Sequence, residues 1–167
     1  MDLDRVAWAY LQQYETTEVN FTRVMHRKAR RREVEPRIVN EWISRFLPRA
    51  RDLDWINDER YANSRAKNWH ARGWGARKIG AKLREKGVPS GLIDELMQTY
   101  GGEAHELKAA HKFARKRKIG PYRRPGVQST PELRKKELGK LARSGFNYGV
   151  AMTVIDAEPI EVVGHSW

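Results

Sequence analysis

The sequence predicts an all-α protein made of three tandem three-helix repeats, each similar to a helix-turn-helix, arranged as an elongated series of modules. Two observations predict this fold. Apolar residues recur at spacings of three and four along most of the chain, and one apolar pattern returns three times at intervals of about 55 residues. No segment before Ile155 alternates between polar and apolar residues, so we expect no sheet.

Nine apolar stripes of helical period follow one another, and we expect nine helices around them. The breaks between them carry turn residues, such as the helix-to-helix turn Gly73-Trp74-Gly75. Thr130-Pro131-Glu132 has the order of an N-cap, a first-turn proline and an acid at the positive helix end. The stripes span residues 6–14, 21–25, 38–46, 61–69, 79–83, 92–97, 107–114, 133–142 and 150–155.

The third helix of each group carries the repeat. Val34-x3-Ile38-Val39-x2-Trp42-Ile43 aligns without a gap to the patterns that begin at Val88 and Phe146, and the preceding turns Lys86-Gly87 and Ser144-Gly145 align as well. We therefore expect repeats at 1–53, 54–102 and 103–157, the last with an insertion around 120–129, followed by a loose tail at 158–167.

The positive charge is concentrated in one part of the chain. Of a net charge of +12, the segment 108–143 holds +11, from thirteen Lys or Arg and two acids. This favours contact with a polyanion or an acidic protein surface. A second basic cluster lies at 23–32, where a solvated helix face and a contact surface remain equal alternatives.

Catalytic and metal-binding patterns are weak, so we expect no enzyme activity, no cofactor and no metal. There is no cysteine, and the nearest histidines, His105 and His111, are six residues apart and fall on different faces of one helix. Asp58 beside Asp54 and Glu59 is better explained as a helix cap than as part of a cation site. No apolar run approaches the ~20 residues of a membrane span, and the acidic start MDLD is unlike a signal peptide, so we expect a cytoplasmic protein.

One run of motifs resembles the signature of the RecX family. It begins with Leu53-Asp-Trp-Ile-Asn-Asp-Glu-Arg-Tyr-Ala62 and continues through Arg72-Gly-Trp-Gly75, Lys78-Ile79 and Leu83-x-x-Lys86-Gly87-Val88. The family pattern has Asp-Asp where this chain has Asn57-Asp58. The opening Tyr10-Leu11 and the closing Arg143-x-Gly145-Phe146-x-Tyr148 also fit, so the resemblance covers residues 5–156.

The resemblance implies the same fold of three three-helix repeats and a regulatory function. Members of this family bind the nucleoprotein filament of the RecA recombinase. They generally inhibit its assembly, ATP hydrolysis, strand exchange and coprotease activity, and so regulate DNA repair, recombination and the SOS response. The resemblance implies a non-enzymatic protein with the RecA filament as partner, and we expect a monomer that also meets DNA through phosphates.

The candidate contact residues follow from charge alone. We expect the segment 108–143 to face acidic RecA surface, DNA phosphates or both, and the second helix of the middle repeat to offer a further basic face. Trp69, Trp74 and Tyr122 lie near basic residues, and Tyr122 is the best candidate for stacking on a base. The candidates are Arg115, Lys116, Arg117, Lys118, Arg123, Arg124, Arg134 and Lys135, with Arg77, Lys78, Lys82, Arg84 and Lys86 on the second face.

Two alternative functions remain open. Instead of regulating RecA, the chain could be a helix-turn-helix-like nucleic-acid-binding protein that acts without RecA, or an adaptor between acidic partners. The second helices carry Lys and Arg but little Asn or Gln, which favours phosphate or protein contact over reading of base sequence.

The elongated arrangement gives a first prediction. A compact chain of this length has a radius of gyration of about 15 Å, whereas stacked modules give a larger value. We expect small-angle scattering to return a radius above about 16 Å, and a value at or below that figure would contradict stacking.

Overall fold

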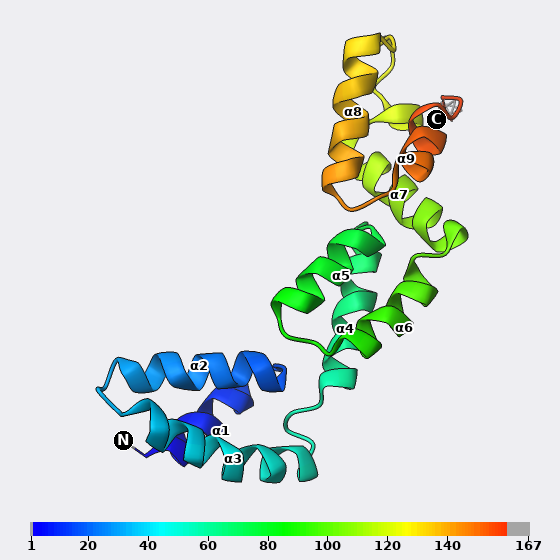
Figure 1. The fold of residues 1–167 in the computed structure, drawn as a ribbon. Coiled ribbons are helices and arrows are strands. Elements are labelled where there is room, and N and C mark those ends of the chain that lie inside the picture. Colours follow the sequence, from blue (N-terminus) through cyan, green and yellow to red (C-terminus); the bar gives the residue numbers. More distant parts are fainter. Residues whose placement is uncertain (1, 160–167) are drawn as a thin grey trace, which may run out of the picture. The chain divides into compact units, whose positions relative to one another are not determined.

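The computed structural model describes residues 2–159, and the regular secondary structure of this part of the chain is all helical, with no strand. The predicted tail at 158–167 lies almost wholly outside the described residues. Nine α-helices and one short 3-10 helix appear in this part of the chain (Figure 1). They are α1 (Leu3–Gln13), α2 (Glu18–Arg30), α3 (Pro36–Asp52), α4 (Asp58–Ala71), α5 (Ala76–Glu85), α6 (Ser90–Tyr100), α7 (Glu103–Arg117), η1 (Gly120–Tyr122), α8 (Pro131–Arg143) and α9 (Tyr148–Ile155).

The helices confirm the fold class and follow the order of the predicted stripes in three groups of three. The turn at 73–75 joins α4 to α5 as expected, and Thr130 caps α8 by accepting a hydrogen bond from Leu133 N at 3.2 Å. Two large side chains of the predicted apolar stripes are exposed and not part of the core: Tyr14 is 56% exposed, and Ile38 on α3 is 52% exposed while its neighbour Val39 is fully buried. The boundaries of the three repeats stay a prediction.

Contacts group the chain into two compact units, and each of the middle three helices contributes residues to both. The first unit holds residues up to 65 together with 82–93, and the second holds 66–81 and the residues from 94 onward. In the first unit, apolar side chains of α1, α2 and α3 form one core around Phe21, Met25 and Phe46, whose rings and thioether are almost fully buried. In the second unit, α7 and α8 pack on α9 around Leu141, Phe146 and Val154, and η1 lies against α7 and α9.

A joint between successive repeats lies inside the first unit. Thr17, the N-cap of α2, donates its hydroxyl to the Lys86 carbonyl in the turn between α5 and α6. One residue later, Glu18 N donates to Asp58 at 2.9 Å, at the start of α4. Gly87 in the same turn has φ +78°, and an added Cβ would lie 2.4 Å from Val19 Cβ, so only glycine allows this approach.

The second unit contains an equivalent joint, 58 residues further along the chain. Gly75 N, in the position of Thr17, donates at 2.9 Å to the carbonyl of Ser144, in the position of Lys86. Ala76 N, in the position of Glu18, donates at 2.7 Å to Glu106, near the start of α7. In both joints, a turn carbonyl and a carboxylate of one repeat hold the start of the second helix of the preceding repeat. At the first joint they accept from the Thr17 hydroxyl and Glu18 N, and at the second from Gly75 N and Ala76 N. The N–H groups among these donors have no partner inside their own helix.

Asp58 was predicted to cap its own helix, and this is wrong. Helix α4 begins at Asp58 itself, and its cap is Asn57, whose side-chain oxygen accepts from Arg60 N at 2.9 Å. The Asp58 carboxylate instead turns to α2 in the preceding repeat. The two adjacent polar residues of the motif therefore accept hydrogen bonds from two different helices, Asn57 from α4 and Asp58 from α2.

The two joint carboxylates give a pH-dependent prediction. Burial raises the pKa of both Asp58 and Glu106 above their ordinary values, against the lowering effect of the N–H each one accepts. The folded state therefore holds these protons more tightly than the unfolded state does. As the pH rises from the ordinary carboxyl pKa through the raised pKa of the folded state, ionisation of each group lowers the free energy of unfolding. Asp58→Asn and Glu106→Gln keep an acceptor oxygen and remove this titration.

We expect the free energy of unfolding of the wild type to fall relative to either variant as the pH rises from about 4 to about 7. Urea denaturation followed by circular dichroism at several pH values measures this difference. A difference that stays constant with pH, or that grows in favour of the wild type, would contradict the proposed cause.

Candidate functional site

The second joint brings three helices of the second unit together around a turn. An added Cβ on Gly75 would lie 2.4 Å from the Gly145 carbonyl carbon, so the start of α5 lies directly against the turn between α8 and α9. Gly145 has φ +95°, and an added Cβ there would lie 2.5 Å from Lys78 Cβ. Two glycines in contact thus place the first turn of α5 beside the last turn of α8.

This contact forms a groove with a basic lining. Its volume is about 280 Å³, and we call it the basic groove. Three helices supply its cations, and none of its lining residues is acidic. The lining residues are Lys78 of α5, Phe113 and Arg117 of α7, Lys140 and Arg143 of α8, and Ser144.

Aromatic rings support the cations of the basic groove. The Lys78 ammonium lies 4.1 Å from the centre of the Trp74 ring, and Trp74 is itself stacked on Trp69 with ring centres 5.2 Å apart. The Arg117 guanidinium lies 5.7 Å from the centre of the Phe113 ring. Cation–π contacts hold both charges in place without neutralising them, which leaves the charges available to an anion.

Helix ends add to the basic character. Arg117 lies in the last turn of α7, and Lys140 and Arg143 lie in the last turn of α8, where cations interact favourably with the helix dipole. Gly139 leaves room for the Arg143 side chain, because a Cβ there would lie 3.3 Å from Arg143 Nη1. The groove therefore presents two guanidinium groups and two ammonium groups, the donors that bind phosphates and carboxylates.

The four predicted residues at the end of α7 are all exposed, but they differ in surroundings. Arg117 lines the basic groove, whereas Arg115 lies over the Tyr122 ring at 5.3 Å. Lys118 ends the helix in a left-handed conformation, with φ +54°. The ring of Tyr122, the preferred stacking candidate, is half-buried beside Arg115, and its hydroxyl is hydrogen-bonded to His111 Nδ1 at 3.0 Å, so its stacking on a base stays a prediction.

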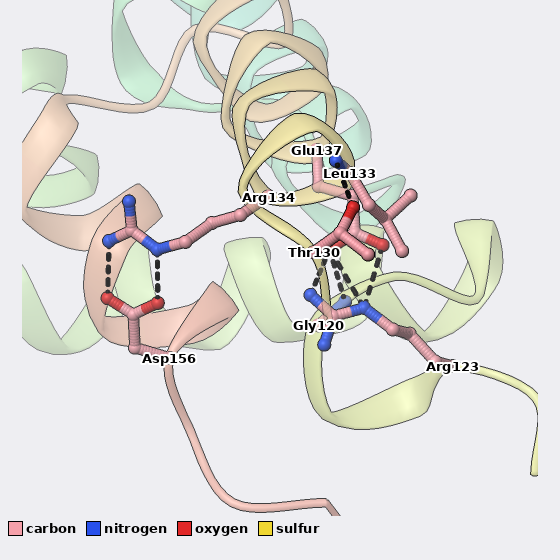
Figure 2. A network of polar contacts seen from close by, with 7 residues as sticks. All are labelled: Gly120, Arg123, Thr130, Leu133, Arg134, Glu137 and Asp156. Atoms are coloured by element: carbon pink, nitrogen blue, oxygen red, sulfur yellow. Dashed lines mark hydrogen bonds and ion pairs between the residues drawn. The ribbon is translucent and has the colours of Figure 1, made fainter. Parts of the chain in front are cut away.

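Two other predicted contact residues are engaged in ion pairs within the second unit, as Figure 2 shows. Arg123 lies against the buried carboxylate of Glu137, with its Nε 3.0 Å from Oε1, and Glu137 also accepts from Gly120 N at 3.2 Å. Arg134 forms two parallel bonds to Asp156, of 2.7 and 2.6 Å (Figure 2). Arg134 holds the pKa of Asp156 below its ordinary value.

The remaining predicted residues lie in different surroundings. Arg124 and Lys135 are exposed in the second unit, as is Arg77 near the start of α5. In the first unit, Lys82 pairs with Glu85 at 2.8 Å and Arg84 is exposed, while the Lys86 carbonyl belongs to the joint described above.

Comparison with known proteins identifies the family. The model of the RecX second three-helix domain matches residues 57–97. The protein called regulatory protein RecX of Myxococcus xanthus (strain DK1622) is 35% identical over 162 residues, which cover 94% of this chain and 86% of that protein. The chain belongs to the RecX family. A second relative of the same name, from Agrobacterium fabrum (strain C58 / ATCC 33970), is 32% identical over 90% of this chain and 82% of its own length.

Solved structures support the fold of this RecX-family chain. The crystal structure of RecX from Lactobacillus salivarius has a TM-score of 0.67 and 22% identity, over 90% of both chains. A second crystal structure, of a regulatory protein RecX, has a TM-score of 0.70 and 22% identity, over 93% of this chain and 74% of the other. Within residues 2–159, no helix is long and apolar enough to span a membrane, and no three acidic or histidine side chains gather into a metal site.

Sequence reasoning missed Lys140 and Arg143 as members of a groove. Their spacing of three places them on one helix face, and they lie just before the Ser144-Gly145 turn that the repeat alignment had already marked. What the sequence did not show was the partner of that turn. Only the close approach of Gly75 to Gly145 brings Lys78 beside them.

The glycine contact yields a prediction with a matched control. Gly75→Ala places a methyl group 2.4 Å from backbone, so we expect it to lower the free energy of unfolding by about 1 to 3 kcal/mol. Gly91→Ala, in α6, meets nothing within 4 Å and should be neutral or stabilising by up to about 1 kcal/mol. Urea denaturation followed by circular dichroism compares the two, and equal stability would show that the contact does not constrain the fold.

Proposed function

We propose that this chain binds the RecA nucleoprotein filament and restrains its assembly, ATP hydrolysis, strand exchange and coprotease activity, and thereby regulates DNA repair and recombination. The observation that carries this proposal is the similarity, over nearly its whole length, to relatives named regulatory protein RecX. The chain acts by occupying the filament, not by catalysis.

The basic groove supports a physical account of this binding. Its four cations have no acidic neighbour in the lining and form no ion pair among residues 2–159. An anionic group of the filament, a DNA phosphate or an acidic RecA side chain, gains charge-assisted hydrogen bonds there. Few such contacts on one protomer are enough to oppose addition of the next.

A titration tests the proposed function. RecA ATP hydrolysis on single-stranded DNA is followed while the protein is added from well below one molecule per RecA protomer. Strong inhibition far below equal stoichiometry supports filament binding. Inhibition that begins only when the DNA is saturated would show that the chain is a nucleic-acid-binding protein that competes for DNA without acting on RecA.

Groove variants test the residues. We expect the triple variant Arg117→Gln, Lys140→Gln, Arg143→Gln to need several times more protein for half-inhibition of the RecA ATPase, because three cations that converge on one anion site are lost. The control is Lys108→Gln, Lys112→Gln, Lys136→Gln, which removes the same charge from exposed positions outside the groove and should inhibit like wild type. Equal loss in both triple variants would show that total charge, not the groove, determines binding.

A further inference from the structure

A further groove lies in the first unit, and the proposed function does not use it. It lies between the end of α1 and the end of α2 and has a volume of about 430 Å³. We call it the tyrosine groove, because two tyrosines line it beside three cations and an amide. These residues are Tyr10, Gln13, Tyr14, Lys28, Arg31 and Arg32, and no acidic side chain belongs to the lining.

The two tyrosines form an aromatic surface that the core does not need. Their rings are 5.1 Å apart and tilted by 33°. Tyr10 is anchored, because its ring lies 6.3 Å from that of the buried Phe21. Tyr14 follows the last residue of α1 in an extended conformation and is 56% exposed. An exposed ring beside an anchored one offers a flat apolar surface to a planar ligand.

The cations of the tyrosine groove lack counter-charges. Three arginines of the first unit have acidic partners: Arg49 pairs with Asp4, Arg51 with Glu18, and Arg60 with Glu15 and Asp54. Among residues 2–159, Lys28, Arg31 and Arg32 form no ion pair. The Lys28 ammonium lies 6.0 Å from the centre of the Tyr10 ring, which places positive charge at the edge of the aromatic surface.

We propose that the tyrosine groove binds single-stranded nucleic acid. Bases stack on Tyr14 and Tyr10, and the phosphates between them contact Lys28, Arg31 and Arg32. Single strands present flat bases and regularly spaced phosphates together, whereas a duplex keeps the faces of its bases stacked inside. An acidic peptide would use the cations and leave the exposed ring without a partner. The Gln13 amide can both donate to and accept from a base edge.

Binding to the protein alone, with no RecA present, tests this site. The probes are fluorescein-labelled oligo-dT and oligo-rU of about 20 nucleotides, followed by anisotropy, and the two probes decide whether the sugar matters. We expect Tyr14→Ala to weaken binding by about fivefold or more, and Tyr14→Phe, which keeps the ring, to bind like wild type. Equal affinity of Tyr14→Ala and wild type would overturn the proposal.

Salt dependence tests the cations. The slope of log affinity against log salt is negative. Arg31→Gln with Arg32→Gln should make it less steep by about 1.4, because each lost phosphate contact on a single strand removes about 0.7 from its magnitude. The control Arg37→Gln with Arg45→Gln removes the same charge from exposed positions of α3 outside the groove and should leave the slope unchanged. An equal fall in the control would reduce the effect to overall charge and overturn the assignment.

Photo-crosslinking locates the strand directly. Oligo-dT that carries 5-iodouracil should crosslink to the peptide that contains Tyr14, as mapped by mass spectrometry. Crosslinks confined to residues 108–143 would place the bound strand elsewhere. Poly-glutamate and unlabelled oligonucleotide are also compared as competitors of the labelled probe. If poly-glutamate displaced the probe more strongly than the unlabelled oligonucleotide, and lost this advantage in Tyr14→Ala, the groove would be assigned to an acidic protein instead. Because RecA is absent from these measurements, their failure leaves the proposed regulation of RecA intact.

Discussion

The rest of the structure depends on one constraint: the first residues of the second helix in one repeat are hydrogen-bonded to acceptors of the next repeat. A helix cannot pair its first N–H groups internally, and a short three-helix module buries too little surface to be stable alone. Here the next repeat supplies acceptors at both joints: a carboxylate accepts from Glu18 N and a turn carbonyl from the Thr17 hydroxyl, and at the second joint a carboxylate and a turn carbonyl accept from Ala76 N and Gly75 N. The hydrogen-bond acceptors that the start of one helix needs are thereby supplied by the next repeat, which makes successive repeats interdependent.

This constraint also explains where positive charge remains. Several acids are used internally: Asp58 and Glu106 at the joints, and Glu137 against Arg123 and Gly120 N. Within the segment 108–143, Glu137 is one of only two acids and pairs with Arg123, and it forms no ion pair with the other cations of that segment among residues 2–159. The surplus of the segment 108–143 is therefore left on outward-facing positions of α7 and α8, and part of it converges where the glycine contact brings α5 beside them.

Much of the fold could be predicted from the sequence, because helical period and turn residues are local signals, and the repeat alignment even placed Gly87 and Gly145 in equivalent turns. The site could be predicted only in part. Asp58 and its partner Glu18 are 40 residues apart, and Arg123 and Glu137 are 14 apart on different elements. Spacing along one helix does not reveal such partners, so a cation in an internal pair and a free one look alike in the sequence. That is why Arg123 and Lys140 could not be distinguished before the structure.

The two grooves both combine cations with aromatic rings, but they differ in whether the rings are covered or exposed. In the basic groove, Trp74 is stacked on Trp69 and lies beneath Lys78, so its face is occupied and it serves to position a charge. In the tyrosine groove, Tyr10 is anchored by the core and Tyr14 extends from it into solvent. Four cations that line one small cavity also repel each other, and an anion bound there would relieve this repulsion in the folded state alone. The proposed anion binding at the basic groove would therefore be coupled to the stability of the contact between Gly75 and Gly145 that forms the groove.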